Sequence, residues 1–197
     1  MYLRCLHRLN SNAIRTVSSD ALAKAAGVKP TQLRKDLTFV GQFGTRGLGY
    51  DVEILSQRIS GLLGTNSLQP VILVGVGNLG SALLTYRGFQ QEGFEIVAAF
   101  DMDPFRKRTK LGPPIYAMDK LPGVIQERGV RMAILAVPAS AAQEVANQLV
   151  AAGISGILNF APIVLSVPED VIVNNVNLAI ELENLSYFIQ TSSAFSL

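Results

Sequence analysis

A run of apolar, β-preferring residues at 71–74 leads directly into the glycines Gly75, Gly77 and Gly80, and then into a helical pattern. This order predicts a buried parallel strand, a tight turn and the N-terminus of a helix that ends at residues 86–89. In such a turn the first glycine permits the reversal, the second leaves room for a pyrophosphate, and the third lets the helix approach the strand. The N–H groups and dipole of the helix N-terminus favour phosphate. The predicted cofactor contacts are Gly75, Val76, Gly77, Asn78, Leu79 and Gly80.

A second apolar strand, 95–101, gives this glycine pattern its context, because Gly-x-Gly-x-x-Gly alone is weak evidence. The strand ends in Asp101, which follows Gly80 by 21 residues, and an acid at about that distance accepts hydrogen bonds from an adenosine ribose. A carboxylate repels a 2′-phosphate, so Asp101 favours NAD over NADP. The alternative is a glycine-rich turn without a ligand, followed by a solvated aspartate.

Three further apolar segments, 132–138, 156–162 and 171–173, extend the pattern and surround a helix predicted at 141–152. Strands alternating with helices predict an α/β fold with a doubly wound parallel sheet. The carboxyl ends of such strands face the ligand cleft, and a nicotinamide would lie there. The candidate pocket residues are Val137, Pro138, Asn159, Phe160, Ala161 and Pro162. Ordinary strand-terminating turns are the alternative.

The N-terminal third differs from the rest in charge. Residues 1–64 contain nine Lys or Arg and four Asp or Glu, whereas the remaining residues carry a net charge of −3. Ser18 is a helix-capping residue before a helix predicted at 20–26, Gly27 ends that helix, and Pro30 begins the next one, at 30–40. Two short helices joined by a glycine turn predict a helix-turn-helix, and the basic charge favours a polyanionic partner.

Double-stranded DNA is the predicted partner of this helix-turn-helix, with the second helix in the major groove. Four glycines at 41–50 around Arg46 predict a β-wing that places an arginine at a minor groove. The candidate contacts are Ser18, Ser19, Thr31, Gln32, Arg34, Lys35, Thr38 and Arg46. A helical hairpin with a polar outer face and a flexible loop is the alternative.

These patterns divide the chain into a winged-helix domain at 1–64, a nucleotide-binding domain at 68–176 and a C-terminal segment at 177–197. The last segment predicts a helix with Leu178, Leu182, Leu185 and Ile189 on one side, which must dock on its own domain or on a partner. One cysteine fits a reducing cytoplasm. We expect no signal peptide, no membrane span and no metal site.

Catalytic machinery is not expected. Tyr116 and Lys120 have the spacing of the catalytic pair of short-chain dehydrogenases, but Pro113 and Pro114 precede Tyr116 and predict a strand there rather than a helix. The single histidine, His7, lies in the predicted DNA-binding domain. A dinucleotide site without a general acid indicates a sensor rather than an enzyme.

Several stretches together resemble the redox-sensing transcriptional repressors of the Rex family. They are residues 17–19, 33–37, 44–50, 75–80, 100–104, 152–162 and 182–188. The resemblance implies a homodimer with the C-terminal helix swapped onto the partner subunit. It implies binding to palindromic operators when NADH is low, and release when NADH binds. It also places Tyr86 near the nicotinamide of bound NADH or NAD⁺.

The chain departs from the family pattern at two points. It begins inside the first helix, without the usual basic arm, and it has Asn177 where an aspartate usually begins the swapped helix. An asparagine carries no charge to pair with a cation. Two other functions remain open on the residues: a small NAD(P)-dependent oxidoreductase, and a CoA-binding module of the kind found in acyl-CoA ligases. Neither explains the basic helix-turn-helix.

Overall fold

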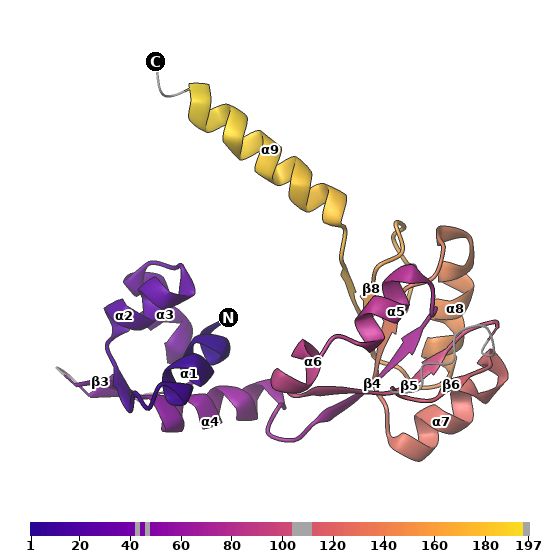
Figure 1. The fold of residues 1–197 in the computed structure, drawn as a ribbon, viewed down its shortest axis with the longest axis horizontal. Coiled ribbons are helices and arrows are strands. Elements are labelled where there is room, and N and C mark those ends of the chain that lie inside the picture. Colours follow the sequence, from indigo (N-terminus) through magenta and orange to yellow (C-terminus); the bar gives the residue numbers. More distant parts are fainter. Residues whose placement is uncertain (42–43, 46–47, 104–111, 195–197) are drawn as a thin grey trace. The chain divides into compact units, whose positions relative to one another are not determined.

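The chain folds as two compact units (Figure 1). A computed structural model describes residues 1–41, 44–45, 48–103 and 112–194. The first unit comprises Met1–Gln69 together with Gln90–Phe94, and the second comprises Pro70–Phe89 and Glu95–Leu197. Residues 90–94 therefore belong to the N-terminal unit. The division expected from the sequence, with domains at 1–64 and 68–176, places them in the second domain.

The first unit has four helices and three short strands within its described residues. The helices are α1 (Tyr2–Ser11), α2 (Ser19–Ala26), α3 (Pro30–Thr38) and α4 (Val52–Leu63), and the strands are β1 (Thr16–Val17), β2 (Gly44–Thr45) and β3 (Gly49–Asp51). The strands form an antiparallel sheet in the order β1-β3-β2. This arrangement is the predicted helix-turn-helix with a β-wing. Leu6, Leu22, Leu33 and Leu55 are completely or almost completely buried in its core.

Capping residues set the limits of these helices. The Ser18 hydroxyl accepts a hydrogen bond from the N–H of Ala21 at the start of α2, and Gly27 ends α2 with a φ of 69°. The Asp51 carboxylate accepts from the N–H of Ile54 at the start of α4. The helix predicted at 30–40 ends earlier, at Thr38. The Thr38 hydroxyl donates to the carbonyl of Lys35, which is characteristic of a last turn.

The second unit contains a six-stranded sheet. Its strands are β4 (Gln69–Val74), β5 (Phe94–Phe100), β6 (Ile115–Tyr116), β7 (Met132–Leu135), β8 (Gly156–Asn159) and β9 (Ile172–Asn175). They lie in the order β6-β5-β4-β7-β8-β9, and the pairs β4–β7, β5–β6, β7–β8 and β8–β9 are parallel. Renumbered along the sheet this is the order 3-2-1-4-5-6 of a doubly wound dinucleotide-binding fold, so the predicted fold class is confirmed.

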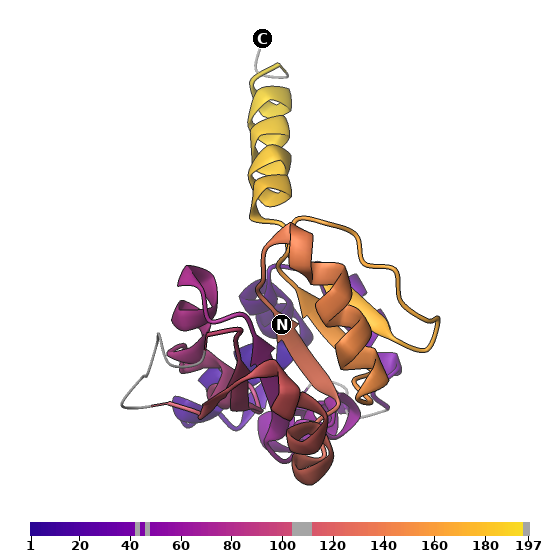
Figure 2. The same cartoon turned by 90° about the vertical axis from the view of Figure 1, so that its right-hand side faces the viewer.

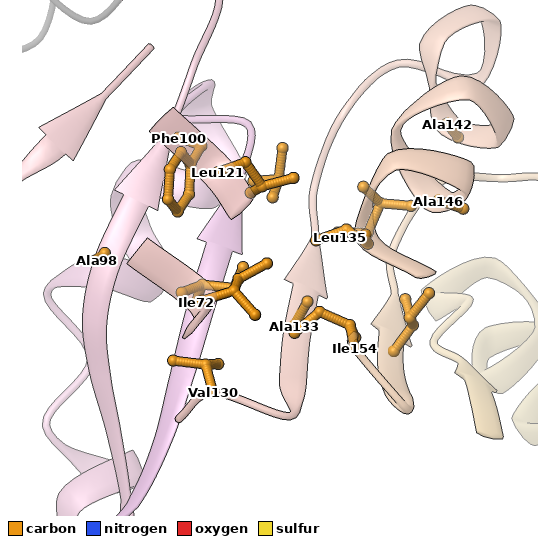
Figure 3. Packing of buried hydrophobic residues seen from close by; sticks show 14 of the residues in the cluster. Ile72, Ala98, Phe100, Leu121, Val130, Ala133, Leu135, Ala142, Ala146 and Ile154 are labelled. Atoms are coloured by element: carbon orange, nitrogen blue, oxygen red, sulfur yellow. The ribbon is translucent and has the colours of Figure 1, made fainter. Parts of the chain in front are cut away.

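Successive side chains along each strand point to opposite faces of this sheet. Ile72 and Val74 join Phe100 and Leu135 in one apolar cluster with residues of α7 (Leu121–Arg128) and α8 (Ala139–Ala151). Figure 3 shows Ile72, Phe100 and Leu135 from this cluster. Leu73 points to the opposite face, where it approaches Gly80 of α5 (Asn78–Leu84). Helices therefore pack on both faces, as a parallel sheet requires.

The first helix after the glycine turn is shorter than predicted. We expected residues 86–89 to end it, whereas α5 ends at Leu84 and a separate short helix, α6 (Gly88–Gln91), follows. The Thr85 hydroxyl donates to the carbonyl of Ala82, 3.0 Å away, and so satisfies a carbonyl of the last turn. The predicted absence of a Tyr116–Lys120 helix is confirmed, because Tyr116 lies in β6 and Lys120 in the 3₁₀ helix η1 (Met118–Lys120).

The C-terminal helix α9 (Leu178–Ala194), yellow in Figures 1 and 2, exposes its apolar side chains. Leu178, Leu182, Leu185 and Ile189 are each more than half exposed, and so are Tyr187 and Phe188. A cluster of this size is unusual on the surface of a monomer. None of the helices in the described parts of the chain is long and apolar enough to cross a membrane.

The hydrogen bond by which Asp51 caps α4 should contribute measurably to the stability of the first unit. Replacing Asp51 with Ala removes the acceptor for the Ile54 N–H and should lower the free energy of unfolding by about 1 kcal/mol. Asp51→Asn is the matched control, because an asparagine oxygen accepts the same bond. Urea unfolding of both variants checks this. An equal loss in both would show that the charge, and not the cap, stabilises α4.

Candidate dinucleotide site and nucleic-acid interface

The glycine turn lies where the strand order of the sheet reverses, between β4 and β7. Gly75 follows β4 with a φ of 95°, and its N–H donates to the carbonyl of Phe100 over 2.8 Å. A Cβ atom at Gly75 would lie 2.5 Å from the Ala136 oxygen and 2.8 Å from Cγ1 of Val137. Position 75 therefore requires glycine for its backbone conformation and for its closeness to the end of β7.

The other two glycines differ in the space around them. A Cβ at Gly80 would overlap the carbonyl oxygen of Gly75 and lie 3.2 Å from Leu73, whereas a Cβ at Gly77 would meet nothing within 4 Å. Gly77 and the next two residues, Asn78 and Leu79, are exposed, and no side chain caps α5. Gly80 thus brings helix and strand together, while Gly77 leaves open space at the helix N-terminus, as expected of a phosphate-binding turn.

Asp101 connects this turn to the end of β5. Its Oδ2 accepts from the N–H of Val76 over 2.7 Å, and its Oδ1 accepts from the N–H of Asp103 over 3.0 Å. Each carboxylate oxygen can accept a second hydrogen bond. The half-buried Asp101 side chain therefore holds the turn and retains acceptor capacity for ribose hydroxyls. The Ser81 hydroxyl supports the same turn by donating to the carbonyl of Val76, a contact that sequence patterns did not indicate.

The predicted pocket residues after β7 and β8 lie at the same edge of the sheet. Val137 is half-buried beside Gly75, and the exposed Pro138 immediately precedes α8. The N–H of Phe160 donates to the carbonyl of Leu135 at the end of β7, over 2.9 Å. Phe160 is half-buried, Ala161 is buried and Pro162 is exposed. The carboxyl ends of β7 and β8 thus meet, as predicted.

Asn159 supports this edge from within the protein. Its side chain is fully buried, and Nδ2 donates to Ile163 O over 2.9 Å and to Asn175 Oδ1 over 2.8 Å. Its Oδ1 accepts from the N–H of Ala161 over 2.9 Å. The Asn159 amide therefore fixes the turn at 160–163 and joins β8 to β9. It acts as a positioning residue beneath the predicted pocket wall.

Tyr86 lies in the short connection between α5 and α6 rather than on the glycine turn. Its ring packs edge-on against Phe89 with centroids 5.1 Å apart and covers Gly88 so closely that a side chain there would overlap it. Tyr86 is 61% exposed. No interaction among the described residues joins its ring to Gly75–Gly80 or to Asp101.

The candidate DNA contacts gather on the outer side of the helix-turn-helix. Thr31, Gln32, Arg34, Lys35 and Thr38 are all exposed along α3. At the start of α2, Ser18 is exposed and Ser19 is half-buried. Arg46, the residue predicted to enter a minor groove, lies outside the described residues. The helix-turn-helix thus presents hydroxyl, amide and cationic groups on one helix.

Asp36 forms a contact on α3 that sequence patterns missed. The Tyr2 hydroxyl of α1 donates to Asp36 Oδ2 over 2.6 Å, and Gln32 Nε2 donates to Asp36 Oδ1 over 2.6 Å. Burial raises the pKa of Tyr2 to about 12, with further contributions from the hydrogen bond and charge of Asp36. The phenol therefore remains a donor at neutral pH. A Tyr and an Asp separated by 34 residues carry no local sequence signal.

Within the ranges that the structure describes, no three His, Cys, Asp or Glu side chains are grouped as metal ligands.

Two family models match the chain. One, described as "CoA binding domain", matches residues 66–163, and the other, described as "Putative DNA-binding protein N-terminus", matches residues 1–38. The two matches fall on the glycine-turn region and on the helix-turn-helix, respectively.

A curated relative matches nearly the whole chain. The redox-sensing transcriptional repressor Rex of Streptomyces coelicolor is 49% identical over 188 residues, which cover 95% of this chain and 73% of the relative. Two crystal structures of a protein named RSP are also similar. RSP in complex with β-NAD⁺ and operator DNA has a TM-score of 0.87 at 36% identity, covering 98% of this chain and 90% of that chain. RSP in complex with β-NADH has a TM-score of 0.84 at 34% identity, covering 98% and 91%.

The different surroundings of Gly80 and Gly77 predict that the same substitution lowers stability strongly at one position and hardly at the other. Gly80→Ala forces a methyl group against the Gly75 backbone and should lower the free energy of unfolding by about 2 kcal/mol or more. Gly77→Ala, which meets open space, should change it by no more than about 0.5 kcal/mol. Thermal and urea unfolding measure both. Equal stability of the two variants would contradict the close approach of α5 to β4.

Proposed function

The chain belongs to the Rex family of redox-sensing transcriptional repressors, and from this premise we propose which of its residues sense NADH and which bind the operator. The observation that carries the assignment is the pairing, in one chain, of an open glycine turn at Gly77 with a helix-turn-helix whose outer helix is polar and basic. The protein represses transcription by binding operator DNA, and NADH releases it. It acts in the cytoplasm and as a regulator rather than as an enzyme.

The glycine turn and Asp101 are the proposed adenosine-diphosphate part of the site. Exposed backbone at Gly77–Leu79 would accept the pyrophosphate, and Asp101, already held by two N–H groups, would accept the ribose hydroxyls. Val137, Pro138 and residues 160–162 would line the nicotinamide end, with Asn159 positioning them. We assign Tyr86 to the same end. When bound, the dinucleotide supplies a redox-dependent charge on its nicotinamide ring.

The proposed operator contacts divide by chemistry. Arg34 and Lys35 on α3 supply positive charge for phosphates, and Thr31, Gln32 and Thr38 supply uncharged hydrogen-bonding groups for base edges. Ser18 and Ser19 lie at the N-terminus of α2, where a phosphate is favoured. We place Arg46 of the wing at the minor groove. Because readers of palindromic DNA are symmetric, we propose that the protein is a homodimer.

We propose that α9 is the main dimer contact and docks on the partner subunit. Its exposed row of Leu178, Leu182, Leu185 and Ile189 needs an apolar surface to cover it. Asn177 precedes this row, and its Oδ1 accepts from the N–H of Ala179 over 3.0 Å, so it caps the helix. An aspartate would cap in the same way. The asparagine therefore keeps the helix and removes only a charge.

The proposed switch is a shift between two conformations of the dimer. NADH favours a conformation in which the two α3 helices do not match successive major grooves, and the DNA-bound conformation spaces them correctly. A ligand that bound both conformations equally well would shift nothing. The preference of NADH for the released conformation over the DNA-bound conformation must therefore be stronger than the corresponding preference of NAD⁺.

Coenzyme A is the second candidate ligand, because a model of CoA-binding domains matches residues 66–163. CoA and NADH share a pyrophosphate that a glycine turn can hold. CoA, however, carries a phosphate on its adenosine ribose, and Asp101 would repel it. Direct competition between the two ligands separates these possibilities.

The first test is operator release. We expect the protein to bind a palindromic Rex-type operator duplex and NADH to release it at concentrations at which NAD⁺ and CoA do not. Gly77→Ala should weaken NADH binding by about tenfold or more, because a methyl group occupies the space left for the pyrophosphate. Fluorescence anisotropy of labelled duplex measures the release, and calorimetry measures the NADH affinity.

Gly123→Ala is the matched control, since a Cβ at Gly123 in α7 also meets open space but lies outside the candidate site. Release by CoA alone would replace NADH with CoA as the ligand. Release by NADH and NAD⁺ at the same concentration would contradict redox sensing. Equal NADH affinity of the Gly77 and Gly123 variants would contradict the assignment of the turn.

The exposed face of α9 predicts the oligomeric state. Replacing Leu182 and Leu185 with Glu places two charges in the proposed dimer contact, so the dimer should dissociate to monomers. Operator affinity should fall with it, because a monomer reads only half of a palindrome. Light scattering after size exclusion measures the mass. Asn184→Glu, at an exposed position on the opposite side of α9, is the control, and a dimeric double variant would contradict docking through this row.

A further inference from the structure

The hydrogen bonds of Asp36 orient the amide of Gln32 on the exposed side of α3. We infer that Gln32 reads an adenine in the major groove and that Asp36 and Tyr2 are positioning residues that hold its amide in the reading orientation. The inference rests on the proposed function in one respect, namely that α3 enters the major groove. It adds which base α3 recognises and which residues orient the amide that recognises it.

The three side chains form a short chain of hydrogen bonds from α1 to the exposed side of α3. Tyr2 of α1, half-buried, donates to Asp36 Oδ2, and Gln32 donates through Nε2 to Asp36 Oδ1, both over 2.6 Å. Gln32 and Asp36 are four residues apart, so they lie on the same side of α3. Asp36 is half-buried, whereas Gln32 is exposed. The outermost member of the chain is thus the amide.

The chemistry of Asp36 fixes which end of that amide faces outward. A carboxylate only accepts hydrogen bonds, so the amide nitrogen must face Asp36, and the carbonyl oxygen Oε1 must point away from it. Nε2 has two N–H groups, and the bond to Asp36 occupies one of them. Gln32 therefore presents one acceptor, Oε1, and one remaining donor.

One acceptor beside one donor matches adenine. In the major groove adenine presents the N6 amino group as a donor and N7 as an acceptor, and glutamine pairs with both. Guanine presents two acceptors, O6 and N7. A freely rotating glutamine can offer both N–H groups to guanine, but Gln32 cannot do so while one N–H is bonded to Asp36. Selectivity therefore comes from preventing rotation of the amide as well as from the adenine contact itself.

Tyr2 contributes by holding Asp36. The phenol bond occupies Oδ2, so the carboxylate is restrained by α1 as well as by its own helix. An acidic side chain that turned outward would also repel the phosphates of the duplex. Loss of the Tyr2 hydroxyl should accordingly relax the orientation of Gln32 without removing it. The neighbouring cations Arg34 and Lys35 have a different role, because contacts to phosphate carry no base preference.

The test is the selection of binding sequences from a library of randomised duplexes with the full-length protein and its variants. The wild-type protein should select an adenine at one position that Gln32→Ala no longer selects, with a loss of discrimination there of about tenfold or more. Preferences at the other positions should persist. Asp36→Asn, whose side chain can donate as well as accept, should admit guanine at the same position. Tyr2→Phe should do so to a smaller extent.

Lys35→Ala is the control, since it removes a cation from the same exposed side of α3. It should weaken binding to all sequences and reduce the salt dependence, whereas Gln32→Ala should leave the salt dependence unchanged. Melting temperatures establish that each variant is folded. If Asp36→Asn unfolds the unit, Tyr2→Phe alone tests the positioning, because Asp36 remains in place.

The outcomes separate the inference from the function on which it rests. If Gln32→Ala selects the same sequence as the wild type with the same preferences, Gln32 is not a base reader. If Gln32→Ala loses the adenine while the folded Asp36 and Tyr2 variants keep full selectivity, the positioning roles are wrong. If the wild type selects no sequence at all, both the inference and the proposed operator binding fail.

Discussion

The close approach of Gly80 to the backbone of Gly75 is the contact on which the second unit depends. No side chain fits between the two residues, so α5 lies against the end of β4. Gly75 in turn contacts the end of β7, and its N–H is bonded to the end of β5. Three strands and one helix therefore meet around two glycines. The open space at Gly77 follows from this arrangement, because the turn that connects so crowded a pair of elements passes outside them.

The two proposed binding surfaces use acidic side chains in the same manner. Asp101 and Asp36 each accept two hydrogen bonds from the protein and remain partly accessible beside a proposed ligand contact. An aspartate so held carries its charge in a defined direction, and it cannot rotate toward an incoming phosphate. At the glycine turn the restrained carboxylate is the proposed acceptor for a ribose. On α3 it restrains a neighbouring amide instead.

Most of the fold could be predicted from the sequence because its signals are local. Ser18, Gly27 and Pro30 mark helix limits, and the glycine turn with Asp101 predicts the strand–turn–helix–strand unit that the sheet contains. The predictions were wrong where local signals compete: the expected helix through residues 86–89 is interrupted after Leu84, and the helix from Pro30 ends at Thr38. The roles of Asn159, Ser81 and Tyr2 depend on partners that the sheet and helices bring together, which spacing along the chain does not reveal.

Residues 90–94 have a further consequence for how this protein can be divided. They belong with the N-terminal unit, where Glu92 pairs with Arg4 over 2.7 Å and the Gly93 carbonyl accepts from the N–H of Gln69 over 2.8 Å. The polypeptide therefore leaves the first unit, returns to it and leaves again before β5 is complete. A fragment that stops at residue 69 lacks both contacts. The winged helix is for this reason not a contiguous domain. Recombination that exchanged it between proteins would have to transfer residues 90–94 as well.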